Sequence, residues 1–175
     1  MQRLLSSILF ASFCFLALSA EECGKTHFID DSGFDLWCDD QLCSWDVETG
    51  NVVQASSWHK GDFAVEFVGD DVVISQVSMD EATTCLRFEV LADIDEDARV
   101  FLSMDFFDDG IVDYEQELGH VRWERLVHLV AVPATWDSVR FTLRKDGPGR
   151  ARLAQIEATA DTECVGAPLE IEDHN

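Results

Sequence analysis

The feature that most constrains the fold is an alternation of apolar and polar residues near the end of the chain. Val139, Phe141 and Leu143 alternate with serine, arginine and threonine residues, so one side of an extended strand is apolar and the other is polar. The segment 145–149, Lys-Asp-Gly-Pro-Gly, is rich in turn-forming residues. A strand with one apolar side has to be covered by a second layer of structure.

A second extended segment follows this turn, and its apolar residues change parity along the chain. Ala151 and Leu153 share one side, whereas Ile156 and Ala158 have the other parity. Such a shift predicts a β-bulge near Ala154–Gln155. We expect the two strands to form an antiparallel pair and to pack against a second sheet that is supplied by the preceding chain.

The same period-two pattern recurs in the rest of the chain, in segments separated by short acidic turns. No long stretch has a helical period, and no internal repeat or linker divides the sequence. The sequence therefore predicts an all-β fold, a two-sheet antiparallel β-sandwich of about nine strands. The expected strands include 63–67, 72–78, 86–90, 100–106 and 121–132, and a hairpin is expected at 46–53.

The first 20 residues have the pattern of a secretory signal peptide. Arg3 precedes an apolar run at 4–18, which small residues and then Glu21–Glu22 follow. The run is shorter than the roughly 20 apolar residues that a membrane-spanning helix needs. We therefore expect a secreted or periplasmic protein that does not insert into a membrane after the signal is removed. The predicted parts are a signal peptide at 1–20, a β-sandwich domain at 21–163 and an acidic tail at 164–175.

The net charge of the chain excludes several classes of ligand. Against 12 lysines and arginines there are 35 aspartates and glutamates, a formal charge of −23. Such a surface repels nucleic acids and anionic lipids, and it disfavours polyanionic ligands. The 12 phenylalanines and 5 tryptophans argue against disorder.

Five cysteines remain after the predicted leader is removed, and in an oxidising compartment most of them should pair. Cys38 and Cys43 are close enough in sequence to close a small loop. Cys164 is expected to pair with either Cys23 or Cys85, which leaves one cysteine free or available for an intermolecular bond. The absence of CxxC spacing favours disulfides over a zinc site.

The order of several short motifs resembles that of the jelly-roll carbohydrate-binding modules of secreted bacterial enzymes, part of the galactose-binding-like superfamily. The resemblance covers roughly Thr26 to Ala160 and implies a sandwich of jelly-roll type. Such modules often have two aspartates in the last strand and bind a structural calcium ion, but this chain has Gln155–Ile156 there. The motifs are Gly33-Phe34 followed by Trp45, Gly61 with Ala64-Val65, Ile74-Ser75-Gln76, Asp105 before Asp109-Gly110, Trp123 leading to Val132-Pro133, Val139-Arg140-Phe141, and Gly149 with Leu153 and Ile156.

The resemblance also implies a concave sheet that takes sugars, built from 72–78, 100–107 and 123–132. Sugar rings present flat C–H faces that stack on aromatic side chains, and their hydroxyls need planar polar partners. We therefore expect non-catalytic binding of a neutral carbohydrate or glycan. The predicted ligand-binding residues are Trp58, Gln76, Phe101, Asp105, Phe107, Trp123 and Arg125.

Two other functions stay open. Five charged residues on the polar strand faces, named at the end of this paragraph, are expected to form cross-strand ion pairs. Each pair is worth less than about 1 kcal/mol when exposed. A sheet covered by such pairs would favour a structural or adhesive surface protein that binds a protein partner. The second alternative is a small jelly-roll glycan lyase or hydrolase, although the sequence contains no catalytic motif. The charged residues are Arg87, Glu89, Arg99, Arg140 and Arg144.

The sequence contains several aspartate clusters, whose carboxylates are the kind of ligand that calcium binds. The segment 105–113 fails the EF-hand pattern, since position 3 is Phe107 and position 12 is Gln116. A calcium site of another kind at Asp30–Asp31 or Asp108–Asp109 stays open. Solvated turn carboxylates are the default expectation, and no other cofactor is expected.

Overall fold

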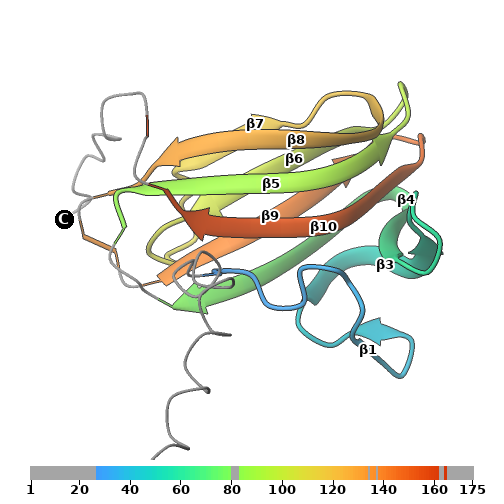
Figure 1. The fold of residues 1–175 in the computed structure, drawn as a ribbon, viewed down its shortest axis with the longest axis horizontal. Helices are drawn as coiled ribbons and strands as arrows, with labels where there is room; N and C mark the ends of the chain where they lie inside the picture. The colour runs from blue at the N-terminus through green and yellow to red at the C-terminus, as the bar shows by residue number, and fades with distance from the viewer. Residues whose placement is uncertain (1–26, 80–82, 134, 137, 162–163, 165–175) are drawn as a thin grey trace, which may run out of the picture.

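The computed structural model describes residues 27–79, 83–133, 135–136, 138–161 and 164. These residues form ten strands and no helix (Figure 1). They therefore contain no helix that could cross a membrane. The strands are β1 (Trp37–Cys38), β2 (Gln41–Leu42), β3 (Asp46–Ser56), β4 (Phe63–Met79), β5 (Cys85–Ile94), β6 (Arg99–Asp105), β7 (Tyr114–Glu117), β8 (Val121–Ala131), β9 (Ser138–Asp146) and β10 (Ala151–Ala160).

Eight of these strands form one hydrogen-bonded sheet that folds into two facing layers (Figure 1). Its order is β7-β6-β9-β4-β10-β5-β8, with β3 paired along β4. We call β8, β5, β10 and the first part of β4 the β5 layer, and the second part of β4 with β9, β6 and β7 the β9 layer. The rings of Phe88 in β5 and Phe141 in β9 stack between the layers, with centroids 6.4 Å apart. The predicted all-β sandwich is confirmed.

Strand β4 belongs to both layers. Its residues 65–67 pair with β10, and its residues 71–79 pair with β9. Between these parts β4 curls (Figure 1). Gly69 lies between the two paired parts, and its positive φ of 110° costs glycine little. Strand β3 follows this curl with a register shift at Gly50. The hairpin predicted at 46–53 is therefore wrong: a bulge, not a turn, lies there.

The last two strands do not pair with each other, so the predicted antiparallel pair is wrong. Strand β9 lies between β4 and β6, whereas β10 lies between β4 and β5. The connection passes from one layer to the other, and the Gly149 N–H donates to the Asp97 carbonyl at 3.3 Å. The predicted bulge is confirmed, because the register shifts between Ala154 and Glu157 and Gln155 has a φ of 50°.

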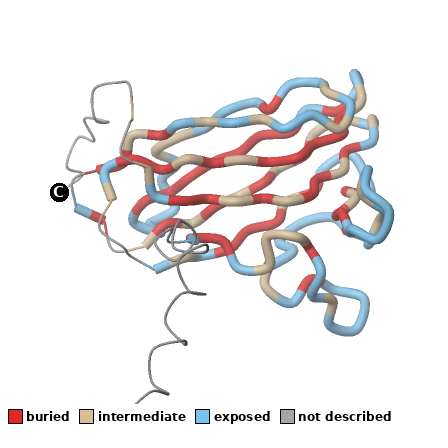
Figure 2. Tube along the Cα trace, in the orientation of Figure 1, coloured by how far each residue is buried: buried red, intermediate tan, exposed pale blue. Residues whose placement is uncertain are grey.

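The core lies between the two layers (Figure 2); buried residues alternate with half-buried ones along β9, and β5 and β6 contain long buried runs. Apolar burial of this kind is the main stabilising contribution to a fold. The fully buried inward-facing residues include Val72, Ile74, Leu86, Phe88, Val90, Val100, Leu102, Met104, Val139, Phe141, Leu143 and Leu153.

The segment before β1 covers the edge of β10 at the point where β4 has left it. The Phe28 N–H donates to the Ala158 carbonyl at 2.9 Å, and the Ile156 N–H donates to the Ser32 carbonyl at 2.7 Å. The expected first strand at 26–29 is reduced to a single bridge among the described residues.

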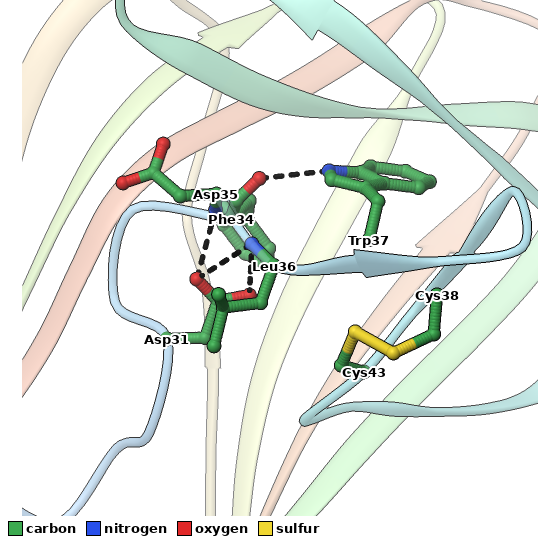
Figure 3. The surroundings of a disulfide bond; sticks show 7 residues. All are labelled: Asp31, Phe34, Asp35, Leu36, Trp37, Cys38 and Cys43. Atoms are coloured by element: carbon green, nitrogen blue, oxygen red, sulfur yellow. Dashed lines mark hydrogen bonds between the residues drawn. A yellow bond between two sulfur atoms is a disulfide. The ribbon is translucent and has the colours of Figure 1, made fainter.

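The predicted disulfide between Cys38 and Cys43 is confirmed, and it closes the small β1–β2 hairpin (Figure 3). The adjoining loop is held by the Asp31 carboxylate. It accepts hydrogen bonds from the backbone N–H groups of Asp35, at 2.8 Å, and Leu36, at 3.2 Å. Short-range side-chain bonds of this type organise turns without secondary structure.

A second disulfide joins Cys85 at the start of β5 to Cys164. It decides between the two partners predicted for Cys164, and Cys23 lies outside the described residues. Two disulfides are typical of proteins that fold outside the reducing cytoplasm.

Candidate functional site

The outer face of the β9 layer carries a row of three small hydroxyl residues in neighbouring strands. Ser75 in β4 and Ser103 in β6 both pair with Thr142 in β9. The two serines are buried on the outer face, where each hydroxyl is hydrogen-bonded to a glutamate. We call Ser75, Thr142 and Ser103 the hydroxyl row.

At one end of the hydroxyl row, Ser75 belongs to a cluster around Arg140. The Ser75 hydroxyl donates to Glu48 Oε1 at 2.5 Å and accepts from Arg140 Nη1 at 3.1 Å. Arg140 also donates through Nε to Asp108 at 2.6 Å and lies 3.5 Å from Glu48. The pKa of Arg140 is raised, first by its hydrogen bond to Asp108, so this end carries a fixed guanidinium.

The other end repeats this arrangement with different residues. The Ser103 hydroxyl donates to Glu115 Oε2 at 3.2 Å, and Arg144 lies 3.5 Å from the same oxygen. Arg144 also pairs with Asp146 at 3.2 Å. A hydroxyl, a carboxylate and a guanidinium therefore meet at each end of the row, all of them capable of hydrogen bonding to a polar ligand.

The aromatic residue on this face is covered by arginines. Phe101 is buried, and the guanidinium carbons of Arg144 and Arg99 lie 4.5 Å and 4.8 Å from its ring centroid. Arg99 in turn pairs with Glu117 at 2.8 Å, and this hydrogen bond lowers the pKa of Glu117. Stacking of a ligand on Phe101 requires one of these arginines to move.

The predicted cross-strand ion pairs are confirmed for Glu89, Arg99, Arg140 and Arg144, whereas Arg87 pairs with Glu89 of its own strand. In the β5 layer, Glu89 is held between Arg87, at 2.5 Å, and Arg125, at 2.8 Å. Burial alone would raise the pKa of Glu89, but hydrogen bonds from both arginines outweigh it and lower that pKa.

Two of the predicted ligand-binding residues, Gln76 and Asp105, are hydrogen-bonded to the backbone of nearby loops. Gln76 points inward: its amide nitrogen donates to the carbonyls of Asp30 (3.1 Å) and Ser44 (2.6 Å), and its oxygen accepts from the Asp30 N–H at 2.8 Å. The buried carboxylate of Asp105 accepts from the N–H groups of Phe107, Asp109 and Gly110 in the β6–β7 loop. Both groups are thus occupied by backbone partners.

Two more predicted residues lie on the opposite side of the molecule. Trp123 and Arg125 are in β8, an edge strand of the β5 layer, so the expectation that 72–78, 100–107 and 123–132 share one concave layer is wrong. Arg125 pairs with Glu89, and Trp123 packs beside Leu91. The physical reason is that β8 pairs with β5, which the sequence pattern could not indicate.

Phe107 and Trp58 have the exposed aromatic rings that were expected. Phe107 is 39% exposed and lies in the β6–β7 loop next to Asp108, hence close to the Arg140 end of the hydroxyl row. Trp58 is 63% exposed in the β3–β4 connection, where its indole N–H donates to His59 Nε2 at 2.9 Å. Phe107 thus lies beyond the Arg140 end of the row, Phe101 lies at the Arg144 end, and Trp58 is in a separate loop.

The aspartates considered for calcium mostly hold their own loops. Asp109 accepts from the Ile111 N–H at 2.9 Å, and Asp108 is paired with Arg140. Burial raises the pKa of Asp31, whose oxygens are turned toward backbone N–H groups. In the ranges that the structure describes, no group of three or more histidine, cysteine, aspartate or glutamate side chains could hold a metal ion.

The hydroxyl row and its two glutamates were not predicted. Period two does place Ser103 with Phe101 on one side of β6, and Thr142 with Arg140 on one side of β9. This periodicity indicates which residues share a side of a single strand, but not which strands are neighbours. Only the pairing of β6 with β9 and of β9 with β4 turns isolated polar residues into a row.

Comparison with known proteins gives similarity at the level of the fold. No family model and no curated protein matches the sequence. Among solved structures, TmCBM61 in complex with beta-1,4-galactotriose is 14% identical, with a TM-score of 0.60 over 78% of this chain and 99% of that one. The carbohydrate-binding module CBM4 is 10% identical, with a TM-score of 0.55 over 76% and 99%.

One enzyme is also similar. The enzymatically active domain of bacteriophage CBA120 tailspike protein 4 is 10% identical, with a TM-score of 0.63 over 77% of this chain but only 21% of the phage chain. TmCBM61 and CBM4, which the match covers over nearly their whole length, are both carbohydrate-binding modules. This chain therefore has the jelly-roll β-sandwich fold of carbohydrate-binding modules.

Proposed function

We propose that this protein is an exported, non-catalytic module that binds a neutral carbohydrate or glycan at the hydroxyl row. The observation that carries the proposal is the pair of serine–glutamate–arginine clusters on either side of Thr142. Sugar hydroxyls both donate and accept, so fixed carboxylates and guanidiniums suit them as partners. The fold shared with carbohydrate-binding modules supports the same function.

Recognition in this proposal depends more on hydrogen bonds than on aromatic stacking. Phe101 lies beneath two guanidiniums, which leaves Phe107 as the exposed ring nearest the row. The clusters are already ordered by their own ion pairs, so little side-chain entropy is lost on binding.

A non-catalytic role agrees with the environment of the carboxylates. Glu48 and Glu115 each lie within 3.5 Å of an arginine and accept a hydrogen bond from a serine, so both carboxylates are held in fixed positions. Export agrees with the two disulfides and with the leader-like first 20 residues.

The test is a neutral glycan array with the mature chain, followed by calorimetry on the best ligand. Arg140→Ala removes one guanidinium, and a lost charge-assisted hydrogen bond of about 1.5–3 kcal/mol corresponds to roughly 10- to 100-fold weaker binding. Thr142→Val removes the central hydroxyl without breaking an ion pair and should also weaken binding.

Arg125→Ala is the matched control, because Arg125 forms a similar surface ion pair on the opposite face. Equal loss of affinity in Arg140→Ala and Arg125→Ala would contradict the assignment of the site. If no neutral glycan binds, the paired charges on this face favour the alternative of a protein partner.

A further inference from the structure

The outer face of the β5 layer carries a second group of residues that the hydroxyl row does not involve. Trp123 lies at a register shift in β8 and has a φ of 49°. A positive φ is strained for a bulky side chain, and bulges redirect side chains. Here the indole lies on the outer face, packed on the cluster of Leu91 and Ala154.

A guanidinium lies over this indole. The Arg152 carbon Cζ is 5.0 Å from the centroid of the Trp123 ring, within the range of a cation–π contact. Arg152 is fixed there because it also donates to Asp93, whose carboxylate is buried. The stack of Arg152 on Trp123 is held from below by the sheet and from the side by an ion pair.

Two further arginines converge on the same aspartate. Arg122 lies 3.3 Å from Asp93 and 2.6 Å from Asp95, and Arg150 lies 3.5 Å from Asp93. The side chains of Arg122 and Arg150 are 66% and 42% exposed. Each guanidinium has five N–H donors, so both keep donors that face solvent.

The balance of charges at this group differs from that at the hydroxyl row. Here three arginines share the carboxylates of Asp93 and Asp95. At the hydroxyl row three arginines contact more carboxylates than their own number: Glu48, Asp108, Glu115, Glu117 and Asp146. In a chain with 35 acidic and 12 basic residues, spare guanidinium donors beside an aromatic ring are an unusual local environment.

We propose that Trp123, Arg122, Arg150 and Arg152 form a second ligand site, which takes a sugar unit bearing one carboxylate, such as a uronic acid. The C–H face of the pyranose ring packs against the exposed side of the Arg152–Trp123 stack. Its carboxylate accepts charge-assisted hydrogen bonds from Arg122 and Arg150. The net charge of −23 repels long polyanions. A single carboxylate in contact with arginines interacts mainly with them, because salt at about 0.1 M screens charges that lie more than about 10 Å away.

The experiment uses the mature chain and three small probes: glucuronic acid, glucose and acetate. Binding is followed by NMR through the indole N–H signal of Trp123, at about 0.1 M salt, where the screening length is about 10 Å. We expect saturable binding of glucuronic acid, at least tenfold weaker binding of glucose and acetate, and at least a tenfold loss in the double variant Arg122→Gln/Arg150→Gln. The control is Arg87→Gln, which changes an arginine on the same face that pairs with Glu89, and it should leave the affinity unchanged.

Three outcomes would overturn this proposal: no saturable binding of glucuronic acid, equal binding of glucose, or equal loss of affinity in the control variant. Acetate binding as tightly as glucuronic acid would also overturn it, because the ring would then contribute nothing. The Arg140→Ala variant should bind glucuronic acid normally, so this site and the hydroxyl row fail or succeed separately.

Discussion

Replacing Gln76 with alanine separates a structural role from a binding role. The side chain of Gln76 makes three hydrogen bonds to the backbone of Asp30 and Ser44, at 2.6–3.1 Å. It thereby fastens the segment before β1 and the start of β3 to the inside of the β9 layer. Each lost bond should cost about 1 kcal/mol, so the free energy of unfolding should fall by about 3 kcal/mol.

That loss is large compared with a total stability of about 5–15 kcal/mol for a domain of this kind. Urea unfolding followed by tryptophan fluorescence measures it, with the midpoint and slope fitted separately. Gln54→Ala is the matched control, because Gln54 is exposed on β3 and its replacement should change stability by less than about 0.5 kcal/mol. Glycan affinity of the folded Gln76→Ala protein should be unchanged.

The reasoning is refuted if Gln76→Ala and Gln54→Ala have the same stability. It is also refuted if Gln76→Ala folds normally but loses glycan binding, since Gln76 would then belong to the ligand site, as the sequence pattern had indicated.

The remaining predictions concern pH, one glycine and one disulfide. Burial lowers the pKa of His128 below 6.5, so at a pH between the folded and unfolded pKa values the unfolded state binds more protons. Stability should therefore fall as the pH drops from 7 through the folded pKa, and His128→Leu should remove this dependence in urea titrations at pH 5–7. Gly50→Ala should destabilise the fold by more than about 1 kcal/mol, because φ is 77° and a Cβ atom would lie 2.5 Å from the Asp71 carbonyl oxygen, whereas Gly61→Ala has open space around it and should cost less. Cys164→Ala should lower the free energy of unfolding by about 2–4 kcal/mol through loss of a bond that closes a loop with a sequence separation of 79, and a wild-type melting temperature in this variant would contradict that role.

Period-two alternation was sufficient to predict the fold class and most strands. It also predicted the bulge at Ala154, because a change of parity is a local property of one strand. Pairing is not local. The segment 145–149 is rich in turn-forming residues and indicated a hairpin, yet the chain uses it to pass between layers, since β9 finds better partners in β4 and β6.

The candidate site was predicted less well for the same reason. Phe101 was placed on the correct side of β6, but its two covering arginines come from β6 and β9 and depend on register. Gln76 has the same parity as the buried Ile74, which indicated that its side chain points inward. The site prediction instead followed its polar character. Trp123 was misplaced because β8 belongs to the other layer.

The continuity of β4 has a mechanical consequence. One strand is hydrogen-bonded to β10 in its first part and to β9 in its second, and β3 pairs with both parts. Bending at that corner therefore bends two paired strands together, and we expect amide protons on either side of Gly69 to exchange in a single cooperative event. Two ligands bound on the two proposed sites would be held back to back at a fixed angle, so the protein would join separate glycan chains instead of wrapping around one.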